Sequence, residues 1–104
     1  NYSRIAGYGR PAYGKDIAVA EGWRKAADGV RWWYEYADQN FAIGWKDLES
    51  ASGKHRYYFD RAGYMLTGWQ FINNHWYFFE TTPNADEGAL YRSDANGIQT
   101  VWTL

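Results

Sequence analysis

Residues 63–80 read GYMLTGWQFINNHWYFFE, and they contain the most informative pattern in the chain. Two aromatic runs flank the dipeptide Asn73-Asn74, whose residues tolerate positive φ at both positions, as a two-residue type I′ turn requires. With this turn, Trp69 lies opposite Phe78. The stretch therefore predicts an antiparallel β-hairpin with paired rings along one face.

The same unit recurs along the chain. Gly-Trp dipeptides begin at Gly22, Gly44 and Gly68, at spacings of 22 and 24 residues. Each is followed by polar residues, a turn signal and an aromatic cluster, as in GWRKAADGVRWWYEYADQNFAI and GWKDLESASGKHRYYFDRAGYMLT. Self-similarity at such a period is typical of stacked repeats.

Turn signals predict the register of the other hairpins. A type I′ turn at Asp28-Gly29 sets Trp23 opposite Tyr34 and Lys25 opposite Trp32, whereas a longer loop at 50–53 sets Trp45 opposite Tyr58. The Asn96-Gly97 dipeptide predicts a closing hairpin with Tyr91 opposite Trp102.

An isolated hairpin is at best marginally stable in water, so the aromatic faces are expected to be buried or shared between neighbours. The fold class that follows is all-β, a β-hairpin solenoid of about three to four stacked repeats. On the opposite strand faces, rings are expected to form the core: Tyr57, Phe59, Tyr77 and Phe79.

The repeats also predict the organisation of the chain. The stretch 81–87, which contains Pro83, reads as a loop insertion before Gly88. The predicted boundaries are an unplaced N-terminal segment at 1–12, a partial repeat at 13–21, repeats at 22–43, 44–67 and 68–92, and a closing hairpin at 93–104.

Composition limits the function classes. A chain of 104 residues predicts one compact unit. Its net charge of -1 argues against nucleic-acid binding, and no apolar run is long enough to predict a membrane span. The acidic residues lie at turn or repeat positions without a catalytic constellation, and His55 and His75 are expected to be strand residues, so no enzyme activity, metal or cofactor is predicted.

Residues 13–92 resemble the choline-binding, or cell-wall-binding, repeats of bacterial and phage surface proteins. The pattern is Gly-Trp, a polar turn, a Trp-Tyr-Tyr-Phe-Asp-like cluster and then Gly-x-Met-x-x-Gly-Trp. The resemblance implies a hairpin solenoid in which choline of teichoic acid lies between two aromatic residues of one hairpin and one of the next. It also implies a secreted, cell-surface location and a non-catalytic fragment of a larger protein, such as a cell-wall hydrolase.

The resemblance implies three aromatic cages. A quaternary ammonium donates no hydrogen bonds and is recognised by ring faces. Arg56 stands where the family has an aromatic residue in the second cage, and its charge would repel choline. The implied cages are Trp23, Trp32 and Tyr58; Trp45 and Phe78; and Trp69 and Trp76 with Tyr91 or Trp102, and with Met65 lining the groove.

Two other binding functions remain open from the sequence. Related aromatic hairpins bind glucans, and Asn73, Asn74 and Asp47 would suit sugar hydroxyls. A terminal hairpin with an open end would suit a homodimer, and residues 101–104 are mildly apolar.

Overall fold

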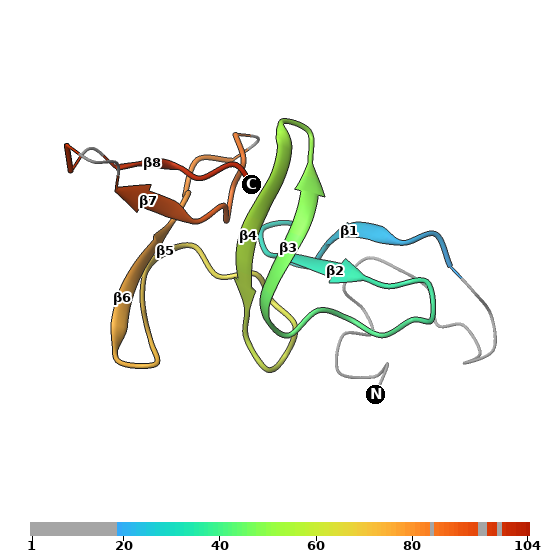
Figure 1. Ribbon diagram of the computed structural model, residues 1–104. Coiled ribbons are helices and arrows are strands. Elements are labelled where there is room, and N and C mark those ends of the chain that lie inside the picture. The colour runs from blue at the N-terminus through green and yellow to red at the C-terminus, as the bar shows by residue number, and fades with distance from the viewer. Residues whose placement is uncertain (1–18, 84, 94–95, 98) are drawn as a thin grey trace. The chain divides into compact units, whose positions relative to one another are not determined.

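The computed structural model describes residues 19–83, 85–93, 96–97 and 99–104, and these residues form four antiparallel hairpins (Figure 1). The all-β prediction is confirmed. The described residues contain no helix that is long and apolar enough to cross a bilayer. The strands are β1 (Gly22–Lys25), β2 (Trp32–Glu35), β3 (Gly44–Ser50), β4 (Gly53–Phe59), β5 (Gly68–Ile72), β6 (His75–Phe79), β7 (Tyr91–Ser93) and β8 (Gln99–Val101).

The predicted N-terminal segment at 1–12 lies outside the described residues, as do residues 13–18 of the predicted partial repeat. The strand positions predicted for His55 and His75 are confirmed, since they belong to β4 and β6.

The predicted register is confirmed in the first hairpin (β1–β2) and in the third (β5–β6). Trp23 pairs with Tyr34, and Trp69 pairs with Phe78. In the third hairpin the turn residues Asn73 and Asn74 have φ values of 50° and 67°, which is the left-handed conformation that a type I′ turn requires.

The turn type predicted for the first hairpin is wrong. Gly29 has a φ of 72°, but Asp28 is not among the described residues with positive φ. The Asp28 carboxylate instead accepts hydrogen bonds from the backbone N–H groups of Val30 and Arg31, which stabilise a wider loop. These bonds lower the pKa of Asp28 to about 2.

Two loops differ from the sequence prediction. The second hairpin (β3–β4) turns at 51–52, because its strands extend through Ser50 and Gly53. In the fourth hairpin (β7–β8) Tyr91 pairs with Val101 and not with Trp102. An odd number of loop residues shifts the register by one position and turns each side chain to the other face, so the predicted pairing of Tyr91 is wrong.

A short loop and an antiparallel bridge follow each of the first three hairpins. In the first two loops the N–H of Tyr36 or Asp60 donates to a carbonyl four residues later, whereas the N–H of Glu80 donates to Ala89, nine residues later. The third loop therefore contains the insertion predicted at 81–87. The bridges are Glu35 with Phe41, Phe59 with Met65, and Phe79 with Leu90.

The contacts divide the described residues into two units, where the sequence predicts one compact unit. The first unit contains residues 19–44 and Phe59–Met65, and the second contains Trp45–Tyr58 and Leu66–Leu104. Repeat proteins divide in this way because each repeat contacts only its neighbours, so no central core is required.

The first unit has an aromatic core around Trp33 and Phe59, which are 1% and 0% exposed. Gly63 permits the close packing of Phe41: a Cβ at this position would lie 2.4 Å from the Phe41 ring, and its φ of 95° also favours glycine. The Met65 N–H donates to the carbonyl of Trp32 at 2.8 Å and joins the loop after β4 to β2.

The core of the second unit consists of Ile72, Phe79 and Leu90, with four partly buried rings around them. Phe79 is fully buried and Tyr57 is 1% exposed, so the predicted core face is confirmed at these residues, as it is at Phe59. The surrounding rings are Trp45, Tyr58, Tyr77 and Trp102.

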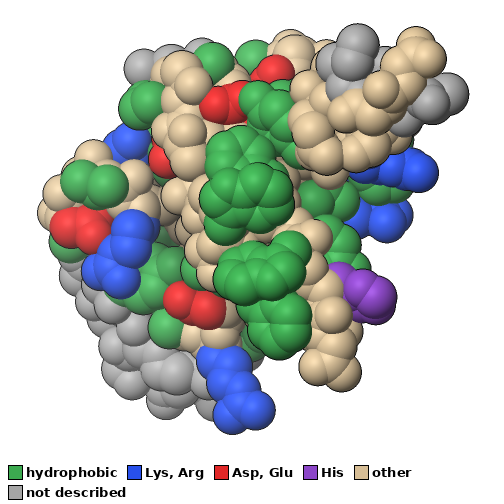
Figure 2. Space-filling model, turned by 90° about the vertical axis from the view of Figure 1, so that its left-hand side faces the viewer, with side chains coloured by type: hydrophobic (Ala, Val, Ile, Leu, Met, Phe, Trp, Pro, Cys, Tyr) green, Lys and Arg blue, Asp and Glu red, His purple; other side chains and the backbone are tan. Residues whose placement is uncertain are grey.

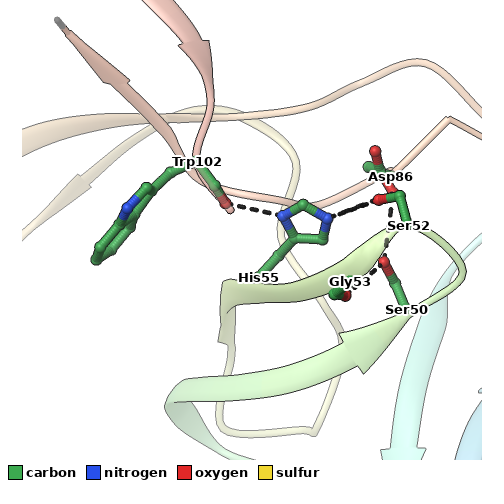
Figure 3. Close-up of polar contacts among 6 residues, drawn as sticks. All are labelled: Ser50, Ser52, Gly53, His55, Asp86 and Trp102. Atoms are coloured by element: carbon green, nitrogen blue, oxygen red, sulfur yellow. Dashed lines mark hydrogen bonds and ion pairs between the residues drawn. The ribbon is translucent and has the colours of Figure 1, made fainter. Parts of the chain in front are cut away.

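A polar network in the second unit joins the insertion and the C-terminal segment to the second hairpin (Figure 3). The buried His55 lies between the carbonyl of Trp102, 2.8 Å from Nδ1, and the hydroxyl of Ser52, 2.8 Å from Nε2. Ser52 donates in turn to the carboxylate of Asp86. The chain end lies beside β4, where the Leu104 N–H donates to the carbonyl of Lys54 (Figure 1).

Candidate functional site

The third hairpin presents an exposed aromatic face, formed by Trp69 and Phe71 on β5 and by Trp76 and Phe78 on β6. The pairing places all four side chains on the same side of the hairpin. Trp69 and Trp76 are each 64% exposed, and Phe71 is 57% exposed. Figure 2, which faces the side of β5 and β6, shows hydrophobic side chains gathered down its middle.

The rings of the aromatic face contact one another across the strands. The centroids of Trp69 and Phe78 are 5.2 Å apart, and those of Phe71 and Trp76 are 5.1 Å apart, both with tilted planes. Tilted rings in contact leave outer faces directed to solvent. Such faces attract a cation through the ring quadrupole.

Tyr91 of β7 extends this face. Its ring packs edge-on against Phe78 with a centroid distance of 5.0 Å. Its hydroxyl donates to Glu80 Oε1 at 2.5 Å, so the pKa of Glu80 is lowered, mainly by this bond, and the pKa of Tyr91 is raised by it. Glu80 therefore orients the Tyr91 ring and adds a negative charge beside the aromatic face.

The second hairpin uses the equivalent positions differently. Arg56 of β4 forms a two-point ion pair with Asp47 of β3, with distances of 2.6 and 3.0 Å. The Trp45 ring contacts Tyr58, Tyr77 and Phe79 at 4.9 to 5.8 Å. Trp45 is thus a packing residue of the second unit.

The first predicted cage is distributed over both units. Trp23 packs against Tyr34 and Phe59 in the first unit. The ammonium of Lys25 lies 4.3 Å from the centroid of the Trp32 ring, so this ring already holds a cation. Tyr58 belongs to the second unit and packs there against Trp45, and the first cage stays a prediction.

Of the residues predicted for the third cage, Trp69, Trp76 and Tyr91 all contribute to the described aromatic surface. Met65 belongs to the first unit, where its backbone N–H donates to the carbonyl of Trp32. The Trp102 ring contacts the guanidinium groups of Arg56 and Arg92. The sequence reasoning missed Phe71 and Glu80. The signal for Phe71 was its position two residues after Trp69, which places it on the same strand face.

No group of three or more metal-ligating side chains occurs in the part of the chain that the structure describes. The aromatic face offers exposed rings and, beside them, the Glu80 carboxylate, and groups of both kinds attract a cation.

Repeated β-hairpins with a solvent-exposed aromatic face define an aromatic hairpin-repeat protein. A family model described as the choline-binding repeat matches residues 43–94, which are 52 of the 104 residues. The chain belongs to the choline-binding repeat family.

Among solved structures, the chain is similar to choline binding protein F from Streptococcus pneumoniae, with 24% sequence identity and a TM-score of 0.29. The similarity covers 79% of this chain and 36% of that protein, so the chain spans about a third of its length. A search of curated proteins found no match.

Proposed function

We propose that this chain is a non-catalytic module that binds choline groups of a bacterial cell-wall teichoic acid through the aromatic face of its third hairpin. The observation that carries the proposal is the exposure of Trp69, Phe71 and Trp76 together on one hairpin. Large rings exposed side by side on a small domain usually mark a binding surface. Membership of the choline-binding repeat family supports choline as the ligand.

The binding mechanism is attraction of the quaternary ammonium by ring faces. Trp69 and Trp76 supply two indoles, and Tyr91 supplies a third wall, held in place by the charged Glu80. Each ring contact contributes about 0.5–2 kcal/mol, so one site binds choline weakly. Several repeats engaging one polymer gain avidity, because the second contact forms at high effective concentration.

The role of such a module is to hold a larger secreted protein at the cell wall. Attachment of a catalytic domain, such as a hydrolase, belongs to this proposal.

A titration of intrinsic tryptophan fluorescence tests the proposal. Choline is added to the unaltered chain and to the Trp76→Ala variant, with glucose oligomers as the parallel ligand. Trp33→Phe serves as a control that removes a buried indole of the first unit.

A saturable choline response that Trp76→Ala weakens and Trp33→Phe keeps would support the proposal. A response to glucose oligomers without any response to choline would contradict it and would assign the module to glucan binding.

A further inference from the structure

A second cluster in the second unit combines an indole with two guanidinium groups. The guanidinium carbon of Arg56 on β4 lies 4.8 Å from the centroid of the Trp102 ring, and that of Arg92 on β7 lies 4.2 Å from it. We call these three residues the Trp102 platform. Its members come from three separate segments of the chain, so it exists only in the folded unit.

Backbone hydrogen bonds of Trp102 and packing of its ring fix the position of the platform. The Trp102 N–H donates to the carbonyl of Leu90 at 2.8 Å, and the Trp102 carbonyl lies 2.8 Å from Nδ1 of His55. Figure 3 shows the indole directed away from the network that fixes this backbone. The ring also packs against the core of Ile72, Phe79 and Leu90. A guanidinium stacked on such a fixed ring loses little further freedom when it binds a ligand.

The Arg56 guanidinium has donors that Asp47 does not engage. Asp47 accepts from Nε and Nη2 of Arg56, which leaves the Nη1 N–H groups for another acceptor. Arg92 is exposed, and its guanidinium lies against the Trp102 ring. Planar N–H groups that point outward beside a ring match the geometry of a phosphate.

The charge at the platform is positive. The hydrogen bond from Arg56 lowers the pKa of Asp47, and the charge of Lys54 lowers it further. Lys54 is therefore close enough to Asp47 to contribute to the same field. Among the described residues, the two guanidinium groups on Trp102 and the Lys54 ammonium supply three positive charges against the Asp47 carboxylate, and an excess of positive charge attracts anions.

We propose that Arg92 and Arg56, stacked on Trp102, form a site for the phosphate groups of the wall polymer. The inference rests on the proposed function, since it assumes the same polymer: a teichoic acid is a phosphodiester chain and presents phosphates as well as choline.

The two sites lie on opposite sides of one strand. Tyr91 and Arg92 are consecutive residues of β7, and consecutive side chains of a strand point to opposite faces. Choline bound at the aromatic face therefore does not occupy the phosphate site. Two independent contacts with one polymer increase avidity without requiring one ligand to fill both.

The test follows the Trp102 indole and the Arg92 Nε–H by ¹H–¹⁵N NMR during titration with two probes: inorganic phosphate, and a short glycerol-phosphate polymer without choline. Arg92→Gln should weaken binding of both about fivefold, the size expected for one exposed charge pair. Asp47→Asn should strengthen it by a similar factor, because it releases the Arg56 donors. Arg61→Gln, which removes the same charge from an exposed loop, is the matched control.

Saturable shifts with both probes, reduced in Arg92→Gln and kept in Arg61→Gln, would support the inference. Binding of inorganic phosphate without binding of the polymer would overturn the assignment to the wall polymer. Absence of any response, or an equal response in Arg92→Gln, would overturn the site itself. A parallel titration of the unaltered chain with choline chloride separates the two proposals. If the chain binds both phosphate probes but not choline, the proposed function is contradicted and the phosphate site is retained.

Discussion

The second and third hairpins begin with the same Gly-Trp dipeptide, but they use their aromatic residues for different purposes. Trp45 of the second hairpin contacts three rings, whereas Trp69 of the third hairpin is 64% exposed. Where the second hairpin has the ion pair of Asp47 and Arg56, the third has the ring pair of Phe71 and Trp76.

In both hairpins the repeated sequence determines the backbone, whereas the neighbouring residues determine whether a ring is packed or exposed. Packing occupies Trp45 and the ion pair replaces a ring pair, so the second hairpin keeps no open aromatic face. The third hairpin keeps four rings on one face, and the Tyr91 ring extends them. Binding is therefore expected at the third hairpin and stability is expected to depend on the second.

The largest expected effect is a difference in the free energy of unfolding between variants of the two equivalent tryptophans, Trp45 and Trp69. Trp45→Ala should lower the free energy of unfolding by about 3 kcal/mol, because it removes a ring packed against Tyr58, Tyr77 and Phe79. Trp69→Ala should lower it by less than about 1 kcal/mol, since most of its ring is in water. Urea unfolding followed by circular dichroism measures both, and equal losses of stability would contradict the different roles of the two tryptophans.

The same pair should behave in the opposite way in ligand binding. Trp69→Ala should weaken choline binding by about 2- to 30-fold, which corresponds to the range of 0.5–2 kcal/mol for one cation–π contact. Isothermal titration calorimetry with choline chloride measures the loss. Trp32→Ala is the informative companion variant: a larger loss there than at Trp69 would return the principal site to the first predicted cage.

The same hairpins show which features of the fold could be predicted from the sequence. Asn73-Asn74 specified a turn and thereby the pairing of Trp69 with Phe78, because a two-residue loop leaves one register. The register of Tyr91 could not be predicted in this way, since a loop with an odd number of residues shifts the pairing.

The rest of the site depended on tertiary contacts. Arg56 was recognised as a departure from the aromatic pattern, but its partners Asp47 and Trp102 are brought to it by folding. Trp102 was a candidate for the third cage from the resemblance to the choline-binding repeats and from its predicted pairing with Tyr91. Its actual place is set by hydrogen bonds to Leu90 and His55, which no local pattern encodes.

The ring pair of the third hairpin can be transferred to the second hairpin. The double variant Asp47→Phe and Arg56→Trp gives the second hairpin the ring pair of the third and removes the cation that repels choline. One additional weak choline site is expected, and its affinity should be no better than that of one ring cage. Equilibrium dialysis measures the number of bound choline molecules, and an unchanged number would show that the ion pair is not what closes the second hairpin.

The smallest expected effect concerns Glu80. Glu80→Gln should weaken choline binding about twofold, the lower limit for a cation–π contact, because the Tyr91 ring loses its charged hydrogen-bond partner. Its effect on stability should depend on pH. The folded pKa of Glu80 lies below 4.5, so its carboxylate stabilises the fold above that pH and this contribution is lost as the pH falls through the folded value. Unfolding curves of both proteins should differ at pH 7 and converge at low pH.

A choline titration followed by the indole N–H resonances of the seven tryptophans in a ¹H–¹⁵N NMR spectrum locates the choline site directly. We expect saturable shifts for Trp69 and Trp76, and an unchanged resonance for the buried Trp33. Shifts confined to Trp23 and Trp32, with Trp69 and Trp76 unmoved, would contradict a choline site on the third hairpin.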